Sequence, residues 1–376
     1  MPRDKYGDRM IVKTNVKLNL GLSVLRKRAD GFHDIETLFV PCFDFGDTLE
    51  IIAGDDYSRT SAALFAKYGG PNARFGASTG SATDKLSDQR DQRQAGSAIG
   101  KLGDQQEASV GELVEPTGLN QSTPKDGKGA ALSGNVTVSE DGKLMITIAR
   151  EEGVDWDPLK DLCAKAYNIL AQDFDLPPVK IFLEKKAPVG AGLGGGSADA
   201  AFTLKALNEL CGLGLDDQRL SDYAARLGSD CAFFIFNRLM IGSGRGEVLE
   251  PYDIDLSEYE VKVLIPEGIS VSTAEAYKGI VPREGHFDKL SDQPGHLCSS
   301  AIGVTEPAKP DTIDDLKPIL AMPVSEWKDK LLNDFEATVF KAHPELAAIK
   351  QSLYDSGAVY ASMSGSGSAL FALYKK

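Results

Sequence analysis

The stretch that decides the fold is PVGAGLGGGSADAA, residues 188–201. Glycine occupies five of the seven positions from 190 to 196. A strand-like segment, VKIFLEK (179–185), precedes the stretch, and an apolar segment with helical spacing, about 197–210, follows it. Glycine lets a backbone approach an anion closely, and a helix N-terminus offers free N–H groups with a partial positive charge. The arrangement therefore predicts a phosphate-binding loop.

Three other interpretations compete with this one. Gly190, Gly192 and Gly195 satisfy the G-x-G-x-x-G pattern of a dinucleotide-binding fold, but the acid about 20 residues on, Glu209, falls in the predicted helix instead of ending a strand. A P-loop requires Gly-Lys-Ser/Thr, and residues 196–198 are Gly-Ser-Ala, which excludes it. A glycine-rich turn that packs closely against another backbone remains a structural alternative.

On the amino-terminal side of the loop the pattern is mainly extended. Residues 11–52 alternate apolar and β-branched positions with Gly and Asp, which predicts two or three strands. NVTVSEDGKLMITIA (135–149) predicts a hairpin that turns at SEDGK. Asp157 and Pro158 are typical of an N-cap and first helical turn, and the apolar stripe after them predicts a helix that ends near Phe174.

On the carboxyl-terminal side the pattern mixes helices and strands. A helix is predicted over 216–227, with Gly228 as its stop signal. YEVKVLIPEG (259–268) is interpreted as the start of a second domain, and a strand pair is predicted around 359–374. Two further helices are predicted in WKDKLLNDFEATVF (327–340) and ELAAIKQSLYDSG (345–357). Since β-α-β alternation is absent from the pattern, an α+β fold is favoured over a doubly wound sheet.

The length of 376 residues predicts two domains. The expected amino-terminal domain covers 9–256 and the carboxyl-terminal domain 257–376. Each contains a polar segment with too little apolar surface to offset its ordering entropy, one at about 57–133 and one at about 284–310. The hexamer DKLSDQ occurs in both, at 84–89 and 288–293, which we interpret as the trace of an inserted repeat element.

Charge and cysteine content exclude several classes of function. The 41 Lys and Arg against 55 Asp and Glu give a net charge of −14, which makes general nucleic-acid binding unfavourable. No stretch approaches the roughly 20 apolar residues of a membrane helix, and the start has no signal-peptide pattern. The five cysteines form no C-x-x-C pair, so neither a disulfide framework nor a zinc site is predicted, and the expected compartment is the cytoplasm.

Several motifs together resemble one known group of enzymes. The run P-x-x-x-G-L-G-G-G-S-A-D-A-A is similar to the ATP-binding motif of the GHMP kinase superfamily. VKLNLGLSVLRKRADGFHDIETLF (16–39), with its R-x-D-G-[YF]-H pattern, resembles the amino-terminal motif of the branch that phosphorylates 4-diphosphocytidyl-2-C-methyl-D-erythritol. SMSGSGSALFALY (362–374) resembles the third, glycine-rich motif, and LGSDCAFF (227–234) and GISVSTAEAY (268–277) stand between them in the family's order.

The resemblance implies a two-domain α+β fold. Its amino-terminal domain would be similar to domain 2 of ribosomal protein S5, its carboxyl-terminal domain would be ferredoxin-like, and the cleft between them would hold ATP and a small-molecule substrate. The implied reaction transfers the γ-phosphoryl group of ATP to the 2-hydroxyl of the cytidylyl substrate, in the non-mevalonate route to isoprenoids. Mg²⁺ is expected with ATP, although the sequence contains no acidic cluster that identifies its ligands.

The same resemblance implies a catalytic pair, Lys17 and Asp230. By itself, Asp230 would be interpreted as a cap of the next short helix, and Lys17 as a solvated residue of an edge strand. In the family, the carboxylate accepts or orients the proton of the substrate hydroxyl, and the lysine favours its ionised form and counters charge on the transferred group. Asn19, on the same strand face as Lys17, would orient the substrate.

The remaining implied residues bind substrate or nucleotide. Phe32 would stack on the cytosine ring and His33 would hydrogen-bond to it, although a lone histidine is more often a packed structural residue. Tyr277 matches the opposing aromatic residue and Thr273 a polar substrate contact. The implied nucleotide-binding residues are Lys185, Pro188, Val189, Gly190, Ala191, Gly192, Leu193, Gly194, Gly195, Gly196, Ser197 and Ala198.

One stretch departs from the family pattern, and a second stretch is assigned no functional role. Pro158 and Leu159 stand where the family commonly has Asn-Leu, which changes one adenosine contact. Arg26, Lys27 and Arg28 are interpreted as a solvated hairpin turn.

The alternatives for function are another GHMP kinase, of mevalonate or homoserine type, and a catalytically silent nucleotide-binding protein of the same fold. RADGFH argues against the first and retention of Lys17 and Asp230 against the second.

Overall fold

The chain begins with four strands, where the sequence predicts two or three. The computed structural model describes residues 9–54, 135–283 and 316–376. The extended run divides because Thr14 N donates to Asp47 O over 2.9 Å, which separates the first two strands into different sheets. The four strands are β1 (Arg9–Lys13), β2 (Val16–Lys27), β3 (His33–Cys42) and β4 (Thr48–Ala53). The predicted insertion, the second polar segment, their hexamers and Cys298 lie outside the described residues.

The first sheet has five strands in the order β1-β4-β7-β6-β5. Its later strands are β5 (Asn135–Val138), β6 (Leu144–Arg150) and β7 (Val179–Lys185). The β5–β6 pair is antiparallel and confirms the predicted hairpin. β6 and β7 run parallel, with Ile146 opposite Ile181, and the other neighbours run antiparallel. The glycine-rich loop leaves this sheet at the end of β7.

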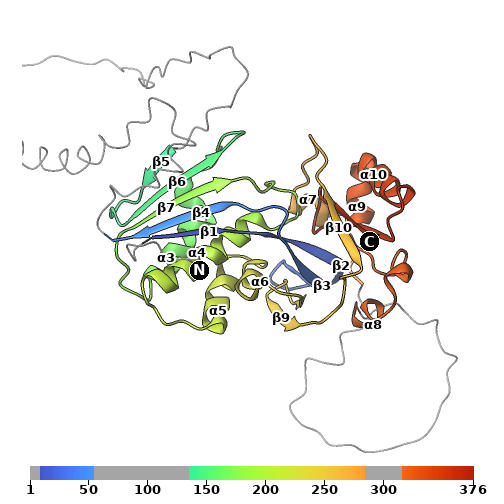
Figure 1. Ribbon diagram of the computed structural model, residues 1–376, viewed down its shortest axis with the longest axis horizontal. Helices are drawn as coiled ribbons and strands as arrows, with labels where there is room; N and C mark the ends of the chain where they lie inside the picture. The colour runs from blue at the N-terminus through green and yellow to red at the C-terminus, as the bar shows by residue number, and fades with distance from the viewer. Residues whose placement is uncertain (1–8, 55–134, 284–315) are drawn as a thin grey trace, which may run out of the picture. The chain divides into compact units, whose positions relative to one another are not determined.

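Three helices pack against this sheet, α3 (Leu162–Ala171), α4 (Gly195–Leu210) and α5 (Asp217–Leu227) (Figure 1). Their apolar faces share one core with the sheet. The predicted limits of α5 are confirmed, because the Asp216 side chain accepts from Arg219 N and Gly228 occupies the C-cap. Glu209 lies in α4, as expected, so it cannot serve as the strand-end acid of a dinucleotide fold.

The prediction of one continuous helix from Asp157 to near Phe174 is wrong. Asp157 caps a short 3-10 turn, η1 (Pro158–Lys160), by accepting from Leu159 N. Asp161 then has an extended backbone and caps α3 itself, accepting from Cys163 N over 2.9 Å. The helix therefore starts four residues later than the Pro158 signal indicates.

The second sheet has the order β2-β3-β8-β9 and the third the order β10-β12-β11. Their remaining strands are β8 (Met240–Ser243), β9 (Val248–Pro251), β10 (Tyr259–Leu264), β11 (Tyr360–Met363) and β12 (Leu370–Lys375). The predicted carboxyl-terminal strand pair is confirmed, and β10, over the stretch where the second domain was expected to begin, pairs with β12. Leu18 and Leu20 of β2 share a buried cluster with Trp327 and Tyr360, so the two sheets enclose one core.

The helix predicted over 327–340 is also wrong in its first half. Residues 332–334 pair with β2 instead, because Leu22 N donates to Leu332 O and Asp334 N donates to Leu22 O. Asn333 donates to Met363 O over 2.7 Å, and α9 begins only at Phe335. The remaining helices are α6 (Cys231–Phe236), α7 (Thr273–Lys278), α8 (Leu316–Leu320), η2 (Val324–Glu326), α9 (Phe335–Ala342) and α10 (Pro344–Asp355).

The α+β class is confirmed by this mixture of sheets and helices. All described residues belong to one compact unit. The division at residue 256 stays a prediction. Within the ranges that the structure describes, no helix has the length and apolarity needed to span a bilayer.

Candidate active site

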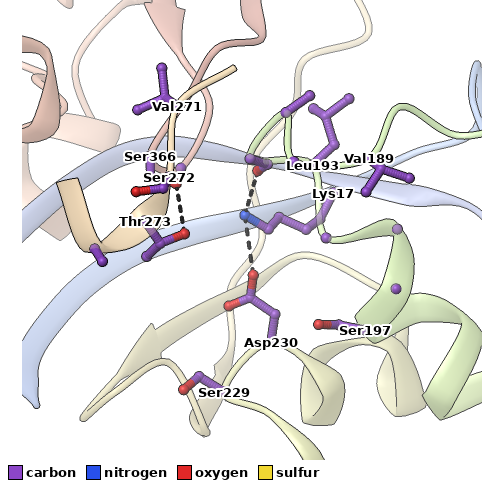
Figure 2. A pocket seen from close by; sticks show the side chains of 18 of the residues that line it. Lys17, Val189, Leu193, Ser197, Ser229, Asp230, Val271, Ser272, Thr273 and Ser366 are labelled. Atoms are coloured by element: carbon purple, nitrogen blue, oxygen red, sulfur yellow. Dashed lines mark hydrogen bonds and ion pairs between the residues drawn. The ribbon is translucent and has the colours of Figure 1, made fainter. Parts of the chain in front are cut away.

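One cleft of about 1160 Å³ collects nearly all of the predicted site residues. The predicted residues reach it from β2 and the β2–β3 turn, from the glycine-rich loop, from the start of α6 and from the segment around Thr273. Figure 2 shows Lys17, Ser197, Asp230 and Thr273 around this cleft. Ala198 alone among the predicted residues does not line it, since this side chain is fully buried in α4. The fold thus brings together residues that are far apart in sequence.

Lys17 and Asp230 face each other in the middle of this cleft (Figure 2). Lys17 Nζ lies 3.3 Å from Asp230 Oδ2 and donates to Gly192 O over 2.9 Å. It also donates to Asn19 Oδ1, so all three donors of the ammonium group have partners. The lysine side chain is 3% exposed and the aspartate 29%, so only the carboxylate is open to a ligand.

The Asp230 side chain does not cap a helix. Asp230 occupies the N-cap position of α6, yet its carboxylate makes no capping hydrogen bond. It is directed to Lys17 instead (Figure 2). The carboxylate of Asp230 is therefore not used to cap its helix. It pairs with a buried lysine and is available for chemistry at the cleft surface.

The glycines of the loop have two kinds of surroundings. A Cβ on Gly192 would lie 2.2 Å from Ser364 O, so this residue must be glycine for close backbone packing. A Cβ on Gly194, where φ is +72°, would lie 3.2 Å from Lys17 Cε. A Cβ on Gly196 would meet no close neighbour, since the nearest atom, Leu162 Cδ1, would lie 3.8 Å away. The close-packing interpretation therefore holds for part of the loop, while another part is left accessible to a ligand.

The N-terminus of α4 opens into the cleft. Gly194 is its N-cap and supplies no side-chain hydrogen bond, and the first turn contains no acidic residue. Gly195, Gly196 and Ser197 line the cleft at this point. A sixteen-residue helix presents unpaired N–H groups and a partial positive charge there, which suits a phosphate group.

Lys185 lines the cleft but its ammonium group is already held by two buried carboxylates. Lys185 Nζ lies 2.5 Å from Asp47 Oδ2 and 2.6 Å from Asp199 Oδ2. Burial lowers the lysine pKa, but Asp199 and Asp47 more than offset this, and the net shift is upward. Burial raises the pKa of Asp199 well above its usual range, and Asp47 adds to the rise while Lys185 opposes it.

This buried cluster fixes the entry to the glycine-rich loop. Asp47 Oδ1 accepts from Lys186 N and from Ala187 N over 2.7 Å, just before Pro188. Thr14 Oγ1 donates to Asp199 Oδ1 over 3.1 Å. Asp47 and Asp199 are not indicated by the sequence, because an Asp after Gly in FGDT and an Asp in a helix resemble ordinary turn and surface residues. Burial is the signal that distinguishes them.

The far end of the cleft is aromatic. His33 stacks on Tyr277, with ring centroids 4.6 Å apart and planes 18° apart, and Tyr277 meets Phe335 edge-on at 4.7 Å. Phe32 is 53% exposed. Burial, with a smaller effect of Lys27, lowers the pKa of His33, which keeps the ring neutral at pH 7. Burial and the nearby Asp230 raise the pKa of Tyr277 to about 12.

Thr273 stands between this aromatic end and the third glycine-rich motif. Its Oγ1 lies 3.1 Å from Ser366 Oγ (Figure 2). Ser366 lines the cleft, and the sequence indicated its motif but not the residue itself. Two hydroxyls at this distance form a small polar contact surface opposite Asp230.

The near end of the cleft contains residues that the sequence did not indicate. Trp156, Lys160, Asp161 and Leu162 all line it, whereas Pro158 is buried and does not. Trp156 Nε1 donates to Asp161 Oδ2 over 3.1 Å, which holds the indole ring in place. A flat aromatic surface beside a helix N-terminus suits a nucleoside attached to phosphate.

The predicted solvated turn is confirmed. Arg26 and Lys27, at the end of β2, are exposed, and Arg28 begins the turn. Arg26 pairs with Asp34, and Arg28 pairs with both Asp30 and Asp34. Neither arginine lines the cleft. Within the described ranges, no group of three or more His, Cys, Asp and Glu side chains is arranged to hold a metal ion.

Comparison with known proteins places this geometry in context. The model of the GHMP kinases N terminal domain matches residues 161–238, and that of the GHMP kinases C terminal domain matches residues 321–376. The chain is 33% identical to the 4-diphosphocytidyl-2-C-methyl-D-erythritol kinase of Parabacteroides distasonis over 98% of its own length and 92% of the relative's. It is 35% identical to the Bacteroides fragilis enzyme of the same name, over 97% and 92%. A crystal structure of 4-(cytidine 5'-diphospho)-2C-methyl-D-erythritol kinase has the same fold, with a TM-score of 0.55, 23% identity, and coverage of 97% and 90%.

Proposed function

The chain belongs to the 4-diphosphocytidyl-2-C-methyl-D-erythritol kinases of the GHMP superfamily, and on this premise we propose how its cleft performs that reaction. The γ-phosphoryl group of ATP is transferred to the 2-hydroxyl of 4-diphosphocytidyl-2-C-methyl-D-erythritol, a step of the non-mevalonate route to isoprenoids. The main support for this proposal is the position of the Lys17–Asp230 pair. It lies between the open N-terminus of α4 and the aromatic end of the cleft at His33 and Tyr277.

ATP occupies the near end of the cleft. Its phosphates meet the N–H groups at the start of α4 and the accessible backbone of Gly196. The adenosine lies along Trp156, two residues before Pro158 and Leu159, which depart from the family motif. In this arrangement Lys185 acts mainly by holding the loop in position, since both of its carboxylate partners are buried.

The acceptor lies at the far end, with its hydroxyl at Asp230. A new bond forms between the hydroxyl oxygen and the γ-phosphorus, while the bond from that phosphorus to the β–γ bridging oxygen breaks and ADP leaves with the electron pair. Asp230 accepts or directs the hydroxyl proton, and Lys17 counters the charge that spreads over the transferred group. Asn19 keeps Lys17 aligned for this task.

The base of the acceptor is held by the aromatic residues. Phe32, which is exposed, offers a face for stacking, and neutral His33 provides one donor and one acceptor nitrogen. Thr273 and Ser366 offer hydroxyls to the polyol. Specificity for a pyrimidine nucleotide therefore resides in groups that do not contact ATP.

Magnesium enters the proposal as part of the ATP complex. Mg²⁺ is commonly held by one or two carboxylates together with phosphate oxygens and water. The cleft provides the Ser197 hydroxyl beside the open start of α4, and the Asp230 carboxylate is already paired with Lys17, so phosphate oxygens and water would supply most of the ion's ligands. When bound, the ion supplies charge neutralisation to the phosphates.

The cytoplasm is the compartment that we propose. Cys42, Cys163, Cys211 and Cys231 are all free thiols in the structure. Unpaired buried thiols are typical of a reducing environment. The expected partners are small molecules only.

The test is a phosphate-acceptor screen with ATP. The wild-type protein should consume ATP with 4-diphosphocytidyl-2-C-methyl-D-erythritol, and not with mevalonate or homoserine.

Asp230→Asn should lower kcat by about 10²- to 10⁴-fold while ATP affinity changes by less than about threefold, since the loop is untouched. Asp222→Asn, on the exposed face of α5, is the matched control. Turnover of Asp230→Asn near the wild-type rate would remove this carboxylate from the mechanism, and turnover of mevalonate instead would reject the proposed acceptor.

A further inference from the structure

The turn between β8 and β9, residues 243–247, reaches the cleft through Arg245. The turn is fixed on β3, because Ile35 N donates to one of its carbonyls over 2.7 Å. A Cβ on Gly246, where φ is +115°, would lie 3.7 Å from Asp230 Oδ1. The residue that follows Arg245 therefore abuts the carboxylate at which the acceptor hydroxyl is proposed to lie.

The Arg245 side chain extends from this point towards the aromatic end. Its guanidinium carbon lies 5.2 Å from the centroid of the Phe32 ring. Nε lies 3.2 Å from Glu247 Oε1, and the backbone N–H of Arg245 donates to Glu247 Oε2 over 2.6 Å. These contacts fix the plane of a side chain that remains 31% exposed.

Arg245 retains donors for a ligand. A guanidinium carries five N–H donors, and its fork matches phosphate oxygens. Only Nε is used by Glu247; the two terminal nitrogens make no hydrogen bond to the part of the chain that the structure describes. A stacked and clamped arginine loses little conformational entropy when it binds an anion.

The other described cations that line the cleft are Lys17, Lys160 and Lys185. Lys17 is engaged by Asp230, and Lys185 by two buried carboxylates. Lys160 lies on η1 at the nucleotide end. Arg245 is thus the cation at the acceptor end with unused donors among the residues that the structure describes.

Resting on the proposed function, we infer that Arg245 binds the diphosphate of the acceptor. In that substrate the diphosphate connects the base to the polyol. Arg245 covers the same interval in the protein, because its guanidinium lies over Phe32 while the next residue, Gly246, lies beside Asp230. Phe32 and Glu247 are then positioning residues for the guanidinium. The arginine selects acceptors that carry a diphosphate, and it acts on binding instead of on phosphoryl transfer.

Direct binding to the full chain tests this inference. Cytidine diphosphate and cytidine are titrated in the presence of a saturating non-hydrolysable ATP analogue, so that only the acceptor end is open. Arg245→Gln should weaken cytidine diphosphate binding by about 10- to 100-fold and cytidine binding by less than about threefold. Arg245→Lys should recover part of the loss, because it keeps the charge but not the fork. In turnover, KM for the acceptor should rise while kcat and KM for ATP stay unchanged.

Arg28→Gln is the matched control, because Arg28 is a nearby arginine that pairs with Asp30 and Asp34 outside the cleft. It should leave both titrations unchanged. An equal loss for cytidine and cytidine diphosphate in Arg245→Gln, or no loss for either, would overturn the inference. If the wild-type enzyme phosphorylates its acceptor and Arg245→Gln does so with the same KM, the inference fails and the proposed function stands. If the wild-type protein neither binds cytidine diphosphate nor uses the acceptor, both fail.

Discussion

Individual glycines of the loop have different tasks although they look alike in sequence. Gly192 is required by its neighbours, since its α-carbon faces the Ser364 carbonyl, and its φ of +76° disfavours other residues. Gly196 has an ordinary helical backbone and open space around it. No packing contact requires glycine at position 196, whereas close packing requires it at position 192, so the two interpretations of a glycine-rich turn apply to different residues.

Substitution by alanine is expected to have opposite effects at these two glycines. Gly196→Ala should leave the free energy of unfolding unchanged or raise it by up to about 1 kcal/mol, because alanine favours a helix. The same change should weaken ATP binding by tenfold or more, since the methyl group occupies the place of a phosphate. Gly192→Ala should lower stability by at least about 2 kcal/mol through overlap and strain. Urea unfolding and nucleotide titration of both variants measure this. Unimpaired ATP binding by Gly196→Ala would show that the phosphates lie elsewhere.

His33 gives the acceptor site a dependence on pH. Its pKa lies below the ordinary value because of burial and, to a smaller degree, Lys27, so the ring is neutral at pH 7. As pH falls through this lowered pKa, the imidazole gains a proton and loses its acceptor nitrogen. Affinity for cytidine diphosphate should therefore decrease below about pH 6.5, by up to tenfold per pH unit.

His33→Gln should remove this decrease, because the amide does not titrate. The measurement is a series of titrations from pH 7.5 to 5 with wild-type protein and variant. Parallel curves for the two proteins would contradict a base-reading role for His33. The wild-type fold itself should also lose stability over the same range, since a histidine with a lowered pKa binds fewer protons than it does in the unfolded chain.

Among the elements, β2 does most to assemble the site. It supplies Lys17 and Asn19 from one end and pairs with β3 along its length. Its backbone also bonds to residues 332–334, which come from the carboxyl-terminal part of the chain. A single strand with partners on both sides fixes Lys17 relative to both ends of the cleft. The β8–β9 turn has the same kind of role for Arg245, because β3 holds it.

The start of α3 allows a test at this scale. Asp161 caps the helix and also accepts from Trp156, whereas Asp157 caps only the short turn η1. Asp161→Ala should lower stability by about 1–2 kcal/mol, and Asp157→Ala by less than about half as much. Asp161→Ala should also raise KM for ATP, because the indole of Trp156 loses its hydrogen bond. Equal destabilisation by the two variants in urea unfolding would contradict this assignment of the helix start.

At the scale of the whole molecule, the described residues share continuous cores across the predicted boundary at residue 256. Val16, Leu18 and Leu20 of β2 are buried with Trp327 and Tyr360. Leu22 and Val24 are buried with Phe335 in a further cluster. Because neither segment can bury these residues alone, the two predicted domains should not unfold independently.

The two tryptophans of the chain make this measurable, since Trp156 and Trp327 lie on opposite sides of the boundary. In Trp156→Phe the remaining fluorescence reports the carboxyl-terminal part, and in Trp327→Phe it reports the amino-terminal part. Fluorescence and far-UV circular dichroism should give coincident urea transitions in each variant. Trp327→Phe should unfold at lower urea concentration, because it leaves a cavity in a fully buried position. Separate transitions within one variant would show that the domains are independent.

Local pattern in the sequence determined the elements and the identity of the site motifs. The glycine-rich loop between a strand and a helix, the α5 limits at Asp216 and Gly228, and the β5–β6 hairpin all follow from interactions between residues close in the chain. Motif resemblance also selected a large part of the residues that line the cleft, because residue type and order are properties of sequence. At Pro158 the prediction was wrong because a second local cap, Asp161, starts the helix later. Over 327–334 it was wrong because hydrogen bonds to the distant strand β2 decided the outcome.

Tertiary structure alone decided which polar groups face one another. The Asp230 side chain turns from its helix to Lys17, across more than two hundred residues of sequence. Asp47 and Asp199 meet Lys185 in a buried cluster that no local pattern indicates. Electrostatic interactions depend on distance and burial, and neither quantity is contained in sequence spacing. For the same physical reason Arg245, which has no motif of its own, becomes a candidate for acceptor recognition only when its turn is folded against Phe32 and Asp230.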